Sequence, residues 1–227
     1  MLRQFYSSTL CKPVLLLLGF TLICLAMLLA RILSTDTIRY SFLVWNLFLA
    51  WVPLAIAVYM QLYFQHKPMH RVYLAVGSVF WLLFLPNAPY IITDLLHLRG
   101  NSDVPVWFDS LLVFSYAMAG LQAGLFSLYI MQGLLEKVFT KKVSYGIIAI
   151  CVWLSSYGVY LGRFQRWNSW DLFTNPGWLL MDSLQQLTNP TAIKMTIAFA
   201  SILTFFYLLF LSLIHWKTYE STHQRTE

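Results

Sequence analysis

The stretch FLPNAPYIITDLLHL, residues 84–98, carries four polar side chains at helical spacing: Asn87, Tyr90, Asp94 and His97. They are three, four and three positions apart, so a helix places them on one face. An aspartate and a histidine three residues apart can both bind one metal ion, or one can orient the other as a general base. The same residues also fit a structural arrangement, in which Asn87 caps a helix end and the other two pair with water or an arginine.

A second polar group lies in GRFQRWNSWD, residues 162–171. Paired arginines three positions apart bind phosphate or carboxylate through bidentate hydrogen bonds. They serve equally well to neutralise nearby aspartates or to reach lipid headgroups, with the tryptophans in an interfacial belt. Combined with the first group, this pattern predicts a substrate-binding set of Asn87, Tyr90, Arg163, Arg166, Asn168 and Asp171.

Asp109 follows the short acidic stretch that precedes VWFDS and opens the next apolar segment. It completes a predicted catalytic set with Asp94 and His97. A carboxylate near a helix N-terminus is also favoured by the helix dipole, whatever its chemistry. We assign no metal and no cofactor from the sequence; if a metal is bound, these three residues are its expected ligands.

The elements that position these residues are membrane helices. The chain is 59% hydrophobic and 11% charged, whereas about a quarter of the residues of soluble domains are charged. Apolar runs of about 20 residues, the length that crosses a bilayer, recur along its whole length. We therefore predict one all-α integral membrane domain, residues 1–227, with six spans at about 13–33, 40–64, 72–98, 109–135, 143–162 and 191–216.

The third of these spans contains two prolines. Pro86 and Pro89 each remove a backbone donor and disfavour helical geometry in the residue before them. We therefore expect the helix to break there and to restart with Asn87 as its N-cap. Irregular backbone inside a membrane must be buried in protein or line a wet cavity, because lipid offers no hydrogen bonds.

Charge sets the expected topology. Nine of the 15 lysines and arginines fall at the termini and in the second and fourth connections. The positive-inside rule therefore predicts both termini in the cytoplasm and a polar site on the outer side. The net charge of +6 is explained by this topology and by contact with anionic membrane lipids, so no nucleic-acid partner is expected.

Two further features concern contacts between elements. Gly120 and Gly124 in the fourth span, and Gly158 and Gly162 in the fifth, have the spacing of close helix contacts. These contacts lie within the chain, with a membrane protein partner, or between copies of a homo-oligomer. Residues 176–190 are too few to span, and we expect an amphipathic helix on the outer surface or a re-entrant cover over the site.

FLPNAPYIITDLLHL, the loop into VWFDS, and YLGRFQRWNSWD together resemble a bacterial family of small multi-pass membrane proteins, domain of unknown function thirteen sixty-one. The resemblance extends from the second span to the sixth. It implies an all-helical fold in a bacterial cell membrane. The family has no assigned reaction, so the resemblance carries no catalytic role to any residue.

These observations favour an uncharacterised membrane protein with an outward-facing polar site around Asp94, His97, Asp109, Arg163 and Arg166. Our first hypothesis is a membrane-embedded enzyme that acts on a lipid or a lipid-linked anionic substrate. The alternatives are a small-solute transporter, since discontinuous helices build many transport sites, and a non-catalytic membrane subunit or scaffold. A single cavity open to the outer leaflet and lined by Asp94, His97, Asp109 and Arg163 favours the enzyme. A polar path that continues to the cytoplasm favours the transporter, and side chains fully paired with one another, with no cavity, favour the scaffold.

Overall fold

The computed structural model describes residues 11–68, 70–98 and 104–223, and this part of the chain contains helices and no strand. The long helices are α2 (Cys11–Thr35), α3 (Phe42–His66), α4 (Arg71–Phe84), α6 (Val106–Leu135), α7 (Lys141–Tyr160) and α10 (Pro190–His223). Shorter elements complete the fold: α5 (Asn87–Tyr90), the 3-10 helix η1 (Ile91–His97), the π-helical turn η2 (Leu161–Gln165), α8 (Asp171–Thr174) and α9 (Pro176–Gln186).

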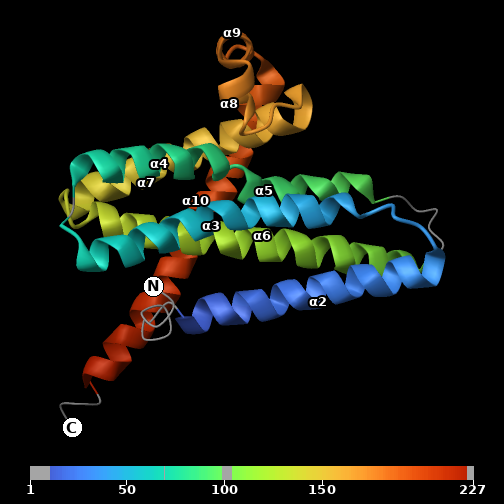
Figure 1. Ribbon diagram of the computed structural model, residues 1–227, viewed down its shortest axis with the longest axis horizontal. Coiled ribbons are helices and arrows are strands. Elements are labelled where there is room, and N and C mark those ends of the chain that lie inside the picture. The colour runs from blue at the N-terminus through green and yellow to red at the C-terminus, as the bar shows by residue number, and fades with distance from the viewer. Residues whose placement is uncertain (1–10, 69, 99–103, 224–227) are drawn as a thin grey trace.

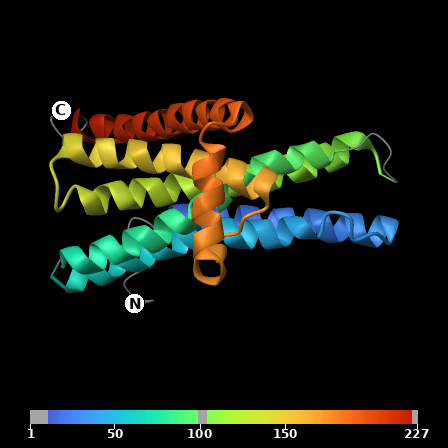
Figure 2. The same ribbon diagram turned by 90° about the horizontal axis from the view of Figure 1, so that it is seen from above.

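Six helical segments of the described chain are long and apolar enough to cross a membrane, with α4, α5 and η1 together forming the third and α7 with η2 the fifth. This confirms the predicted all-α, polytopic fold with six such helices. Figure 1 shows α2, α3 and α6 lying along the long axis, with α4, α5 and η1 following one another beside them. The view in Figure 2 shows α9 lying across these long helices.

Helix α6 is the centre of the bundle. Most of its residues are buried, including Leu112, Tyr116 and Met131, because α2, α3, α5 and η1 all pack against it. A helix that is apolar around its whole circumference is expected to be surrounded by other helices. Helix α7 pairs chiefly with α10 and also contacts α6 and α5, so its end lies beside the start of segment 86–97.

The predicted break at Pro86 and Pro89 is not confirmed. Leu85 has φ −54° and ψ −38°, and Pro86 has φ −57° and ψ −28°, so both keep right-handed helical geometry. The hydrogen bonding changes instead: the Ala88 amide donates to Leu85 O at 3.1 Å, which tightens the turn. Asn87 is the first residue of α5 rather than its N-cap, a position held by Pro86. The third span is thus distorted but continuous.

The four glycines of the two spaced pairs lie against this distorted segment. A Cβ on Gly158 would stand 2.6 Å from Pro86 Cγ, and one on Gly124 would stand 2.9 Å from Ala88 Cβ. At Gly120 the close neighbours are Ile91 and the carbonyl of Ala88, and at Gly162 the ring of Tyr90. Within the chain, therefore, these glycines allow α6 and α7 to approach residues 86–91 closely.

We expect Gly158→Ala to lower stability, because the new methyl group meets a rigid proline ring rather than a flexible side chain. Overpacking of this kind costs about 1–3 kcal/mol. Gly146→Ala, on the same helix with open space around it, is the matched control and should be neutral or slightly stabilising. Thermal unfolding of both variants in detergent measures the difference; equal midpoints would contradict the packing argument.

Candidate functional site

Asp94 is the centre of a buried polar cluster. It is 1% exposed and accepts a hydrogen bond of 2.7 Å from Asn46 Nδ2 on α3. Its other oxygen lies 3.4 Å from Arg163 Nη1 of η2 and 3.7 Å from His97 Nδ1. The structure thus brings Asp94, His97 and Arg163 together from two spans, and a third span contributes Asn46.

His97 is the accessible member of this cluster. Its side chain is 44% exposed, compared with 15% for Arg163 and 1% for Asp94. Arg163 Nη2 lies 3.3 Å from His97 Nδ1, and the Phe42 ring packs against the imidazole with centroids 5.1 Å apart. A molecule approaching from outside therefore reaches the imidazole before it reaches the carboxylate.

The position of Arg163 follows from the local backbone. At the end of α7 the chain widens into the π-helical turn η2, and Arg166 ends it in the left-handed conformation with φ 61°. Single π-turns redirect side chains and often occur at functional sites. Here the wider turn directs Arg163 to Asp94, whereas Arg166 is exposed and has no ion pair within the described part of the chain.

Asp109 belongs to a different cluster. Arg31 holds it through two hydrogen bonds, Nε to Oδ1 at 2.7 Å and Nη2 to Oδ2 at 3.3 Å, and both side chains are buried. The Arg31 guanidinium also lies over the Tyr40 ring, 4.7 Å from its centroid. Burial raises the pKa of the Tyr40 hydroxyl, and the negative charge of Asp109 raises it further. This pair joins α2 to α6, and Asp109 is not among the contacts of Asp94.

The described residues contain no group of three or more histidine, cysteine, aspartate or glutamate side chains that could hold a metal ion. Asp94 and His97 instead share their space with a cation, Arg163. The arrangement resembles a positioned imidazole beside a carboxylate more than a set of metal ligands.

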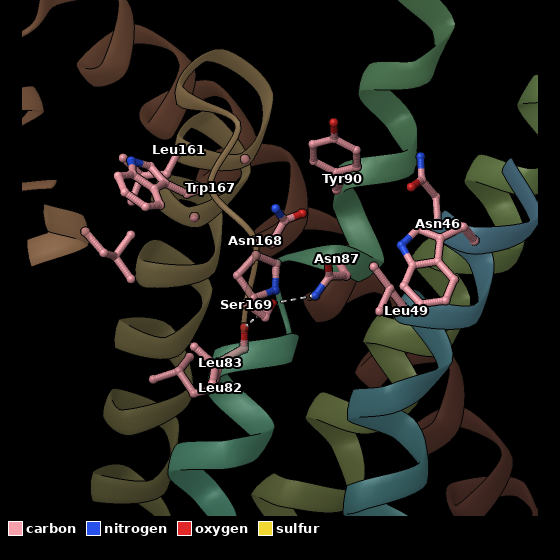
Figure 3. Close-up of a pocket in the computed structure, with 15 residues that line it drawn as sticks. Asn46, Leu49, Leu82, Leu83, Asn87, Tyr90, Leu161, Trp167, Asn168 and Ser169 are labelled. Carbon is pink, nitrogen blue, oxygen red and sulfur yellow. Dashed lines mark hydrogen bonds between the residues drawn. The ribbon is translucent and has the colours of Figure 1, made fainter. Parts of the chain in front are cut away.

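A pocket of about 240 Å³ lies next to this cluster at Asn46, but Asp94, His97 and Arg163 do not line it. It is enclosed by α3, by α4 and α5, by the end of α7, and by residues 166–170, which we call the 166–170 loop. In Figure 3, Asn46 and Leu49 on one side face Asn87 and Tyr90, while Asn168 and Ser169 come from the loop. Asn46 lines the pocket and also binds Asp94, so it connects the two features.

The 166–170 loop is held in place by the backbone of the distorted third span. Ser169 Oγ donates to Leu83 O at 2.9 Å, and Asn87 Nδ2 donates to both Phe84 O and Ser169 Oγ, each at 2.9 Å. These side chains satisfy carbonyls near the two prolines, where regular helix hydrogen bonding is lost. The predicted residue Asn87 thus has a structural role as well as a position in the pocket.

Asn168 and Asp171 stabilise the following turn together. The backbone amide of Asn168 donates to Asp171 Oδ2 at 2.7 Å, and its side-chain nitrogen lies 3.3 Å from the same oxygen. Thr174 also donates to Asp171. Of this pair, only Asn168 lines the pocket.

Helix α9 is attached to the site by polar contacts. Trp167 Nε1 donates to Asp182 Oδ2 at 2.6 Å, and the Tyr157 hydroxyl donates to the Ser183 carbonyl. Its large apolar side chains are exposed on the outside: Trp178, Leu180, Met181 and Leu184. A short helix is therefore present in the segment predicted to be amphipathic, with Leu179 as its contribution to the pocket.

Asn46 was not singled out in the sequence, and Ser169, although it lies in GRFQRWNSWD, was not among the predicted site residues. Asn46 is the single amide in the first half of the apolar helix α3, and Ser169 is a small residue in a loop rich in larger polar ones. The first had a recognisable signal, since an isolated polar residue inside a membrane span is rarely without function. Nothing in the sequence singles out Ser169, because its partner is a backbone carbonyl.

We expect Arg163→Ala to destabilise the protein by about 2 kcal/mol, because it leaves the buried carboxylate of Asp94 without its cation. Arg166→Ala, which removes an exposed arginine three residues away, is the matched control and should leave stability unchanged. In thermal unfolding the double variant Asp94→Asn/Arg163→Ala should lose less than the sum of the single changes. Strict additivity would show that the two side chains do not interact.

Comparison with known proteins places this site within one family. The family described as protein of unknown function, DUF1361, has a model that matches residues 45–211. This range includes the whole pocket and the cluster around Asp94, whereas Arg31 lies outside it. No curated protein and no solved structure matches the chain. Because the match covers most of its length, the chain belongs to the DUF1361 family of proteins of unknown function.

Proposed function

We propose that this protein is a membrane-embedded enzyme that acts on a lipid or a lipid-linked anionic molecule, whose headgroup enters the pocket beside Asp94. The observation that carries the proposal is the pocket itself, which is open on one side, lined by both amide and apolar side chains, and formed between helices apolar enough to span a membrane. Membrane-spanning segments rarely keep polar side chains around a cavity without a functional reason.

The rim of the pocket supports access from the lipid phase. Trp45 lines the pocket and is 54% exposed, and its ring packs edge-on against exposed Trp170 with centroids 6.3 Å apart. Indole rings favour the boundary between lipid and water. The excess of lysines and arginines at the termini and in the second and fourth connections supports an orientation with cytoplasmic termini. We therefore propose a cell-membrane protein whose pocket faces the outer leaflet.

The roles follow from exposure. His97 is the group that acts as acid or base, since it is the accessible titratable side chain of the cluster. Asp94, 3.7 Å from His97 Nδ1, and Arg163 are positioning residues that hold the imidazole. Exposed Arg166, next to the pocket residue Trp167, supplies the positive charge for a phosphate.

The two alternatives are less well supported. A transporter needs a path through the protein, but the lining includes Leu49, Leu82 and Leu83, which favours binding from one side. A scaffold needs only paired charges, and both Asp94 and Asp109 are paired. Paired charges alone, however, do not require a cavity beside them.

The pocket can be filled without disturbing the bundle. Leu179 on α9 lines it, whereas its neighbour Leu180 is 62% exposed and does not. We expect Leu179→Trp to reduce the lipid that co-purifies with the protein at least about tenfold, since losing about 1.4 kcal/mol of binding has that effect. Leu180→Trp is the matched control and should retain it. Mass spectrometry of lipids extracted from the purified proteins is the measurement, and equal lipid content in both variants would reject the pocket.

Chemistry is tested separately from binding. In a deletion strain supplied with His97→Ala, we expect a lipid or lipid-linked molecule of the cell envelope to accumulate, because the variant binds it but lacks the acid–base group. Co-purified lipid should be unchanged from the wild type. A normal envelope lipid profile with normal binding would rule out the enzyme and leave a binding protein.

A further inference from the structure

The hydrogen-bonding groups that remain available in the pocket are mainly acceptors. Three amides line it, those of Asn46, Asn87 and Asn168. The nitrogen of Asn46 faces the Asp94 carboxylate, and that of Asn168 faces the Asp171 carboxylate. The nitrogen of Asn87 donates to a backbone carbonyl and to Ser169.

These partners fix the orientation of each amide. A carboxylate or a carbonyl accepts hydrogen bonds and cannot donate them, so the nitrogen, not the oxygen, must face it. Within the described residues no hydrogen bond reaches the three amide oxygens. An amide oxygen that lines a pocket without a protein partner is available to accept a hydrogen bond from a ligand that displaces water.

Besides the amide oxygens, the hydroxyl group of Tyr90 is available for hydrogen bonding in the pocket. The Tyr90 hydroxyl has no hydrogen bond to the described part of the chain, and it can both donate and accept. Trp45 and Trp167 add flat apolar surface beside it, and the Trp45 indole N–H is a further available donor, whereas that of Trp167 is taken by Asp182. Among the described residues, no lysine, arginine, aspartate or glutamate lines the pocket.

Charged ligand groups fit this lining poorly. A phosphate inside the pocket would face the amide oxygens, which repel it. An ammonium group could also donate to the amide oxygens, but it would lose hydration without gaining a carboxylate to balance its charge, because Asp94 is buried and already paired. Neutral hydroxyl groups donate to the amide oxygens without the desolvation penalty of a charged group.

The volume of the pocket restricts the size of the headgroup that it can hold. A volume of about 240 Å³ equals that of roughly eight water molecules, at about 30 Å³ each. This accommodates a single sugar ring and is much larger than an aminoethyl group. A sugar also offers apolar C–H faces, which pack on aromatic rings such as those of Trp45 and Trp167.

From these observations we infer that the headgroup taken by this pocket is a neutral sugar ring, so that the ligand is a glycolipid or a lipid-linked sugar. The inference rests on the proposed function, which it deepens by naming the class of headgroup. In a lipid-linked sugar phosphate the ring occupies the pocket and the phosphate stays outside it, on the side of exposed Arg166.

The test uses the full-length protein in phosphatidylcholine nanodiscs that contain, in turn, glucosyl diacylglycerol, phosphatidylethanolamine or phosphatidylglycerol. Native mass spectrometry then reports which lipid stays bound after release from the disc. We expect retention of the glucosyl lipid, and its loss in Leu179→Trp. A parallel titration with methyl glucoside distinguishes a lipid-bound sugar from a free one.

Two pocket variants test the hydrogen bonds directly. Tyr90→Phe removes the free hydroxyl, and Asn168→Ala removes an amide oxygen while the backbone amide still binds Asp171. Each should weaken binding of the glucosyl lipid about tenfold. Asn175→Ala, an exposed asparagine near the pocket that does not line it, is the matched control and should bind like the wild type.

The outcomes separate the two proposals. Retention of phosphatidylethanolamine or phosphatidylglycerol instead, with loss in Leu179→Trp, overturns the sugar inference but supports the lipid site. Binding of methyl glucoside without the glucosyl lipid supports the sugar and overturns the lipid-linked ligand. Retention of no lipid and no sugar overturns both.

Discussion

The structure depends on how one membrane span satisfies its backbone around two prolines. Neither Pro86 nor Pro89 can donate a hydrogen bond, and Ala88 donates to Leu85 O instead of the carbonyl four residues earlier. Carbonyls at this depth must find protein donors, because lipid provides none. The donors are Asn87, which binds Phe84 O, and Ser169, which binds Leu83 O. The 166–170 loop is therefore folded back onto the third span, and one wall of the pocket is formed as a result.

The same constraint determines what packs around the span. Neighbouring helices must come close enough for loop side chains to reach the backbone, and glycine is the residue that permits this on both sides. Gly158 accepts the Pro86 ring, and Gly120 lies against the carbonyl of Ala88. The spaced glycines, the prolines and the loop thus form one mutually dependent unit.

Sequence reasoning found the fold and part of the site for physical reasons that are local. Apolar runs identify spans, and helical spacing together with the alternation of the connections brought Asp94 and Arg163 together correctly. The sequence does not show which arginine pairs with which aspartate, because Arg31 and Arg163 are both expected on the same side of the membrane. Only the packing of α2 on α6 pairs Arg31 with Asp109. The predicted helix break at Pro86 and Pro89 is not confirmed either. Leu85 keeps helical geometry, and nearby side chains compensate for the backbone donors that the prolines lack. Contacts made to backbone carbonyls, such as that of Ser169, leave no pattern in the sequence.

The separation of charge from cavity is the feature that most restricts the chemistry. In a low-dielectric environment an unpaired charge is expensive, so the buried carboxylates are each matched with a guanidinium before any ligand arrives. Pairing of this kind holds helices in register but leaves little free charge for recognition. The ligand is then recognised by neutral groups. In the amides of Asn46 and Asn87, for example, the nitrogen is already bound to other side chains, so the oxygen is the atom left to accept a hydrogen bond. Under the proposed function, such a site distinguishes ligands by the positions of their donors rather than by net charge, and His97, at the exposed edge of the cluster, is the group proposed to move a proton.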